Sequence, residues 1–92
     1  MARFFLNVVN GRERVRDLEE REFQSLAAAR TEALESAREL IGQCLLEGLP
    51  LGLKRHFEIV DAEGRRLAQV SFAEAIPNED DIPAFDARGV RA

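Results

Sequence analysis

Apolar and polar residues alternate at the start of the chain, in residues 3–9, and this alternation is typical of a β-strand. Successive side chains of a strand point to opposite faces, so Phe5 and Val9 share one face of this strand. The other face carries Phe4, Leu6 and Val8. Asn10-Gly11 then favours a tight turn, and the highly charged residues 12–17 are predicted to return as the edge strand of a hairpin.

A long helix is predicted next, after an acidic, irregular stretch at residues 18–24. Ser25 is suited to be its N-cap, and Gly48 before Leu49-Pro50 is typical of a helix end. Between them, apolar residues recur at intervals of three and four. They are Leu26, Ala29, Ala33, Ala37, Leu40 and Cys44. Because alanine side chains are small, a sheet can approach this helix closely, and we expect larger strand residues to fill the space. Those residues are Phe4, Leu6, Phe57, Val70 and Phe72.

A second hairpin is predicted after the helix, with strands at residues 54–60 and 65–72. Asp61-Ala62-Glu63-Gly64 forms the turn between them, and a short helical turn follows at residues 73–76. The order is therefore ββαββ, which predicts an α+β fold with a four-stranded antiparallel sheet and one long helix packed across one face. We expect residues 1–76 to form a single domain and residues 77–92 a loosely ordered acidic tail.

The sheet face away from the helix is predicted to be unusually apolar for a solvated surface. Phe5, Val9, Val60 and Leu67 fall on it, among polar neighbours that include Glu58. Exposed apolar patches of this kind usually mark contacts, so we favour self-association as a homodimer through these four residues. The alternative is that the tail covers this face. The tail residues suited to do so are Ile82, Phe85 and Val90.

Composition narrows the class of protein. The chain has 92 residues, of which 46% are hydrophobic, and its 17 acids and 13 bases give a net charge of −4. No apolar run approaches the roughly 20 residues that a bilayer span requires, and the apolar run at the start ends at Asn7, too early for a signal peptide. The single cysteine excludes an internal disulfide, so we expect a cytoplasmic protein with no membrane contact.

Residues for catalysis or metal binding are scarce. His56, the only histidine, would need a carboxylate and a nucleophile beside it, and its pairing with Glu58 is common on solvated sheet faces. Cys44 lies on the apolar stripe of the helix, where a buried thiol is inert. Glu79-Asp80-Asp81 lacks the spacing of a calcium loop, and no glycine-rich phosphate loop is present. We therefore predict a protein that is not an enzyme, needs no cofactor or metal, and acts through contact with a protein partner.

Single-stranded nucleic acid is the alternative partner. Phe5 offers a stacking surface, and several arginines on the hairpins could contact phosphates. These are Arg12, Arg14, Arg16, Arg65 and Arg66. One aromatic makes a poor platform, acids are interleaved with the arginines, and the net charge is negative, so this partner is less favoured.

Several short motifs resemble one known family. They are Arg3-Phe4-Phe5, Asn10-Gly11, Asp17-Leu18-Glu19, the helix motif Leu26-Ala27-Ala28-Ala29-Arg30, Phe57-Glu58-Ile59-Val60-Asp61 and Val70-Ser71-Phe72. Together they resemble a family of short, uncharacterised bacterial proteins, mostly alphaproteobacterial, over about residues 3–76. Its members are catalogued as a domain of unknown function. The resemblance therefore implies a small cytoplasmic domain and supplies no activity.

Overall fold

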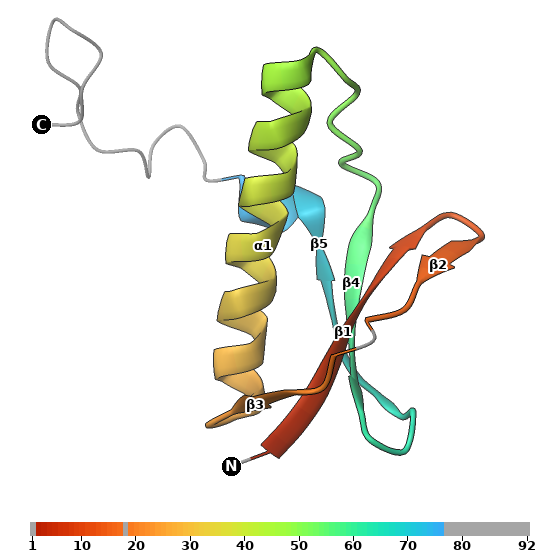
Figure 1. Cartoon of the computed structure of the whole chain (residues 1–92), viewed down its shortest axis with the longest axis vertical. Coiled ribbons are helices and arrows are strands. Elements are labelled where there is room, and N and C mark those ends of the chain that lie inside the picture. The colour runs from red at the N-terminus through yellow and green to blue at the C-terminus, as the bar shows by residue number, and fades with distance from the viewer. Residues whose placement is uncertain (1, 18, 77–92) are drawn as a thin grey trace, which may run out of the picture.

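The computed structural model describes residues 2–17 and 19–76, which form one antiparallel sheet with a single long helix on one of its faces (Figure 1). The elements are β1 (Ala2–Asn10), β2 (Glu13–Val15), β3 (Arg21–Phe23), α1 (Leu26–Glu47), β4 (His56–Asp61), β5 (Arg66–Ser71) and the 3₁₀ turn η1 (Phe72–Ala75). The predicted α+β class is confirmed. The expected acidic tail, residues 77–92, lies outside the described residues.

The strands are ordered β2-β1-β4-β5, and every pairing is antiparallel. The long strand β1 pairs with β4 along one edge. Its other edge is shared, because β2 pairs with Val8–Asn10 and β3 pairs with Ala2–Phe4. The prediction of one return strand over residues 12–17 was therefore wrong in extent, and so was the prediction that residues 18–24 are irregular throughout. The return chain leaves the edge after β2 and rejoins it as β3.

Helix α1 begins and ends where the sequence predicts. The Oγ of Ser25 accepts a hydrogen bond from the N–H of Ala28 (3.1 Å). Gly48 adopts the left-handed conformation (φ 70°), which lets the N–H of Leu49 donate to the carbonyl of Cys44 (2.9 Å). This pattern ends helices because glycine pays no steric penalty at positive φ.

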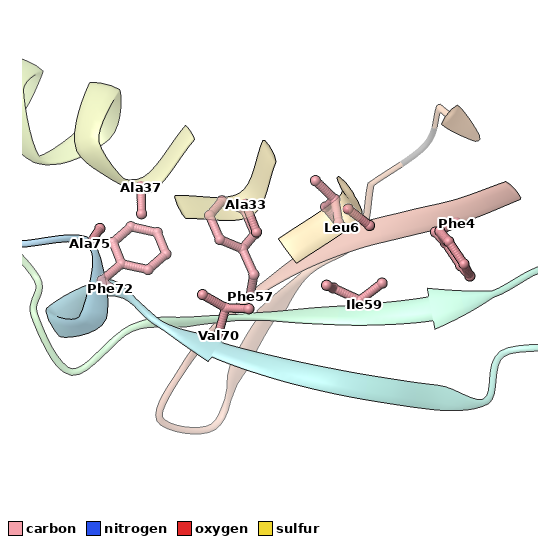
Figure 2. Packing of buried hydrophobic residues seen from close by; sticks show 10 residues of the cluster. Phe4, Leu6, Ala33, Ala37, Phe57, Ile59, Val70, Phe72 and Ala75 are labelled. Atoms are coloured by element: carbon pink, nitrogen blue, oxygen red, sulfur yellow. The ribbon is translucent and has the colours of Figure 1, made fainter. Parts of the chain in front are cut away.

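The core lies between α1 and the sheet, and its composition follows the prediction (Figure 2). Ala29, Ala33 and Ala37 are completely buried. Against them lie Phe4, Leu6, Phe57, Ile59, Val70, Phe72 and Ala75. The rings of Phe57 and Phe72 stack with their centroids 5.1 Å apart. Each such ring contributes several kcal/mol, since truncating a buried phenylalanine to alanine typically costs about 3–5 kcal/mol. The alanine stripe thus fixes how closely helix and sheet approach.

The second hairpin is shorter than predicted at both ends. β4 begins at His56 rather than at residue 54, because the N–H of Arg55 closes a turn onto the carbonyl of Gly52 (3.0 Å). β5 ends at Ser71, whose Oγ accepts a hydrogen bond from the N–H of Ala73 (3.2 Å) and starts η1 one residue early. Within the described ranges, no helix combines the length and the apolarity needed to cross a bilayer.

Candidate functional site

The face of the sheet opposite α1 is built by cross-strand pairs of β1 and β4. Phe5 lies opposite Val60, Asn7 opposite Glu58, and Val9 opposite His56. Because Phe4 and Leu6 point into the core, the intervening residues of β1 point away from the helix. We call this surface the open face of the sheet.

The four residues predicted to form an interface fare differently on this face. Phe5 is half-buried and lies directly opposite Val60, so the structure brings these two together. Val9 and Val60 expose only 8% and 9% of their surface. Leu67 is 43% exposed, but the β4–β5 register shifts between Ile59 and Val60, so Leu67 has no residue opposite it. The open face therefore offers less exposed apolar area than the sequence predicts.

Glu58 occupies the middle of the open face and is 5% exposed, although its sequence pattern is typical of a solvated sheet face. Arg14 of β2 binds the Glu58 carboxylate through two donors, Nε to Oε1 (2.9 Å) and Nη2 to Oε2 (3.1 Å). Nη1 of Arg66 lies 3.6 Å from Oε2. A forked guanidinium matches a carboxylate, which explains how the charge is buried. Sequence reasoning missed this cluster because its three residues meet only through the register of three separate strands.

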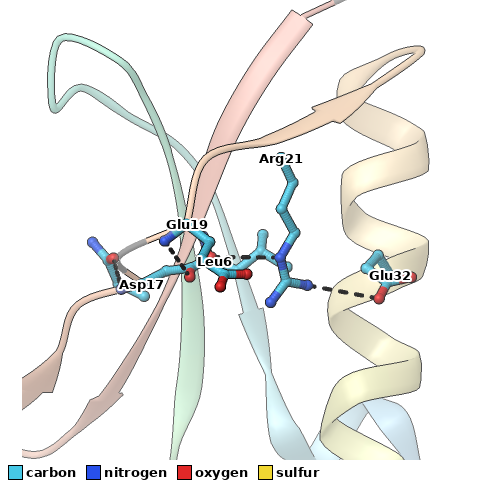
Figure 3. A network of polar contacts seen from close by, with 6 residues as sticks. Leu6, Asp17, Glu19, Arg21 and Glu32 are labelled. Carbon is cyan, nitrogen blue, oxygen red and sulfur yellow. Dashed lines mark hydrogen bonds and ion pairs between the residues drawn. The ribbon is translucent and has the colours of Figure 1, made fainter.

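Asp17 is the second carboxylate beside the open face (Figure 3). Its Oδ2 accepts a hydrogen bond from the N–H of Leu6 in β1 (3.1 Å), and its Oδ1 accepts one from the N–H of Glu19 (3.1 Å). Its own N–H donates to Oδ1 of the buried Asn7 (2.9 Å). Nε of Arg21 lies 3.7 Å from Oδ2 of Asp17. Asp17 thus replaces a strand residue at the gap between β2 and β3, which is the physical reason that the return chain can break.

A hollow of about 660 Å³ opens on this face. Phe5 and Val60 form its apolar part, and Arg14, Arg16 and Arg66 lie around it. The acids that line the hollow are Asp17, Glu58 and Asp61.

Asp61 is the third of these acids, and it closes the β4–β5 turn. Its Oδ1 accepts the N–H groups of Arg65 and Glu63 (2.9 Å each), and Nε of Arg65 donates to its Oδ2 (2.8 Å). These hydrogen bonds, led by the one from the Arg65 backbone, hold the pKa of Asp61 below its ordinary value.

A second surface lies at the C-terminal end of α1. The last fully buried helix residue is Ala37, and the helix continues to Glu47, rising past the sheet in Figure 1. The large apolar residues exposed there and in the following loop are Leu45 (69%), Leu46 (85%), Leu49 (53%) and Leu53 (39%), whereas Leu40 (40%) borders a groove shared with Leu6 and Phe57 of the sheet. We call the first four the leucine end. The sequence shows these leucines, but only the structure shows that the sheet is too short to cover them.

Arg55 holds the loop of the leucine end in place. Its Nη2 donates to the carbonyl of Leu51 (2.8 Å) and its Nε to that of Gly52 (3.1 Å). Its guanidinium carbon lies 4.4 Å from the centroid of the Phe72 ring, within cation–π range. The loop is thereby tied to the core.

The family comparison covers both surfaces. A family model described as a domain of unknown function, DUF6894, matches residues 3–73. The chain belongs to the DUF6894 family. The match runs from β1 into η1, so it contains the hollow and the leucine end alike. Searches of curated proteins and of solved structures find no match for the chain. The predicted resemblance to a family of unknown function is therefore confirmed, and it assigns no activity.

The remaining chemical candidates do not come together in this DUF6894 domain. His56 is half-buried on the open face, two residues from a Glu58 carboxylate that Arg14 already holds. Cys44 is half-buried, with Sγ 3.9 Å from Nη2 of Arg55, so the expectation that it lies in the core was wrong. It falls beyond Ala37, where the sheet no longer covers the helix. Among the residues that the structure describes, no group of three or more His, Cys, Asp or Glu side chains could hold a metal ion. The predicted acidic run at residues 79–81 lies outside them.

Proposed function

We propose that this DUF6894 protein acts by protein–protein contact rather than by catalysis, and that it pairs with a second copy through the leucine end. The observation that carries the proposal is the exposure of four leucines at one end of the molecule, including Leu46 at 85% and Leu45 at 69%. Isolated exposed leucines are common on protein surfaces, whereas a group of them at one end usually marks a contact.

The exposed area suits a small dimer. From their exposed fractions, the four leucines leave on the order of 400 Å² of apolar surface in water. A standard interface buries about 800 Å² on each partner, of which somewhat more than half is apolar. Because Leu45 and Leu46 point about 100° apart on α1, a single contact covers part of this area, and the leucine end supplies a substantial part of the apolar share of such an interface.

The shape and charge of the leucine end favour a second copy as the partner. The end of α1 extends past the sheet, so two copies can lay these ends side by side without contact between their sheets (Figure 1). Exposed Glu47 and Lys54 border the leucines with opposite charges. A twofold contact places the same patch on both partners, so it can bring the acid of one copy to the base of the other.

The open face is the other candidate for self-association, as the sequence predicts. Val9 and Val60 are already about nine-tenths buried there, so a second copy would gain little from covering them. A twofold contact through the open face would also bring Glu58, Arg14 and Arg66 of one copy close to the same charged residues of the other. For these reasons the leucine end is the better surface.

Sedimentation or light scattering of the full chain at tens of micromolar tests the proposal. We expect a dimer for the wild type and a monomer for Leu46→Glu, which introduces a charge at a side chain too exposed to matter for folding. Thr31→Glu is the matched control, because it adds the same charge to an exposed position of the same helix about four turns from Leu46 and should leave the dimer intact. A monomeric wild type would overturn the proposal. Loss of the dimer only in Phe5→Asp would assign the contact to the open face.

Single-stranded nucleic acid is the second candidate partner, and one observation favours it: Phe5 shares the hollow with Arg14 and Arg66. It predicts salt-sensitive binding that weakens when both arginines are replaced by alanine. The net charge of −4 and the engagement of Arg14 by Glu58 weigh against it.

A further inference from the structure

The hollow on the open face combines an apolar part with arginines that are more exposed to solvent than its acids. Phe5 and Val60 supply the apolar part, and Arg14, Arg16 and Arg66 lie around them. A site with apolar area and a few convergent polar groups is the common form of a binding pocket.

The acids of the hollow are turned inward and are already paired. The side chain of Glu58 is 7% exposed between two arginines, and that of Asp17 is 11% exposed and accepts two backbone N–H groups. Asp61, at 16%, is held by the N–H groups of its own turn and by Arg65.

The arginines, in contrast, reach water. The side chain of Arg14 is 52% exposed and that of Arg66 is 60% exposed. Arg16 is exposed too, and it makes no ion pair with any residue in the part of the chain that the structure describes. Although the formal charges of the lining cancel, the charge presented to a ligand is positive.

We propose that this hollow binds an acidic segment of a partner protein. One apolar side chain of the segment rests against Phe5, and its carboxylates face Arg16, Arg66 and Nη1 of Arg14. The inference goes beyond the pairing of two copies, because it uses a different surface and a different partner. Since the hollow offers one half-buried aromatic, a short acidic peptide fits it better than a nucleic acid, whose successive bases need a series of stacking surfaces.

A peptide titration followed by two-dimensional amide NMR of the full chain tests the inference. The probe is a synthetic peptide Asp-Ile-Glu-Asp-Phe-Glu, whose sequence does not occur in the chain and which joins four acids to two large apolar side chains. In the protein itself the four acids of residues 79–86 are replaced by the corresponding amides, so that this segment does not compete with the peptide. We expect saturable shifts of the Phe5, Val60 and Gly64 amides.

Three comparisons separate the outcomes. Arg16→Glu should weaken peptide binding by at least about fivefold, as the reversal of one exposed charge allows. The matched control Arg12→Glu, at an exposed position outside the hollow, should leave it within about twofold. A peptide with amides in place of its acids should not bind.

Absence of shifts, equal effects of Arg16→Glu and Arg12→Glu, or tighter binding of oligothymidylate than of the peptide would each overturn the inference. Leu46→Glu should bind the peptide as the wild type does, so failure of the dimer and failure of this site are distinguishable.

Discussion

Replacement of Asp17 by alanine is the sharpest test of how the sheet is held together. The substitution removes the acceptor of the Leu6 N–H, which lies in a residue only 5% exposed at the gap between β2 and β3. A buried N–H without a partner costs about 1–3 kcal/mol, and the loss of the half-exposed contact with Arg21 adds up to about 1 kcal/mol. We therefore expect Asp17→Ala to lower the free energy of unfolding by about 2–3 kcal/mol.

Urea unfolding and amide hydrogen exchange measure this effect directly. A loss of about 2–3 kcal/mol corresponds to a fall in Tm of roughly 10–20 °C for a domain of this size. Asp17→Asn keeps one oxygen for the Leu6 N–H and should lose about half as much. Glu19→Ala, an exposed neighbour, is the control and should change stability by less than about 0.5 kcal/mol. Unchanged protection of the Leu6 amide in Asp17→Ala would refute the role given to this carboxylate.

Three further substitutions probe other parts of the fold. Ala33→Leu places a large side chain at a completely buried position and should lower the free energy of unfolding, measured in urea, by about 1–3 kcal/mol. Ala27→Leu, on the exposed helix face, should be nearly neutral. Gly52→Ala puts a methyl group on the Arg55 guanidinium at a positive φ (68°) and should cost about 1–2 kcal/mol, with a weaker hold on the loop seen as faster amide exchange there. Because folding lowers the pKa of Asp61, its charge adds stability at pH 7 that is lost as the pH falls below about 4. Asp61→Asn should therefore unfold at lower urea than wild type at pH 7, and an equal gap at pH 2.5 would contradict this reasoning.

The helix and the core could be predicted because their signals are local. Ser25 and Gly48 bound α1 through contacts within a few residues of the chain, and the alanine stripe follows from the helical period alone. The pairing of that stripe with Phe57 and Phe72 needed only the rule that large side chains fill the space beside small ones.

The break in the return strand could not be predicted, because it depends on a tertiary contact. No pattern in the sequence around Asp17 indicates that its carboxylate will accept the hydrogen bond of the Leu6 N–H in place of a neighbouring strand. The burial of Glu58 is similar, since it requires the registers of β2, β4 and β5 at once. In both places a charged residue predicts contact with solvent, whereas the structure buries its carboxylate.

The leucine end could not be predicted because α1 is longer than the strands of the second hairpin. A helix of 22 residues is roughly 33 Å long, whereas the six-residue strands β4 and β5 extend roughly 20 Å. The apolar stripe continues through Leu40 and Cys44 as if it were covered. Periodicity reports which face of a helix is apolar, but it does not report where the neighbouring layer stops.

The continuous helix between Ala37 and Leu46 sets the direction in which the leucine end points. Each residue turns an α-helix by about 100°, so a single deletion there would swing the leucines around the axis while the alanines stayed fixed on the sheet. Because Ile41 packs against the core and Arg55 ties the following loop to Phe72, one deletion would both turn the leucines away from the partner copy and disturb these contacts. The number of helical residues between the alanine stripe and the leucine end therefore determines the direction in which the leucine end faces.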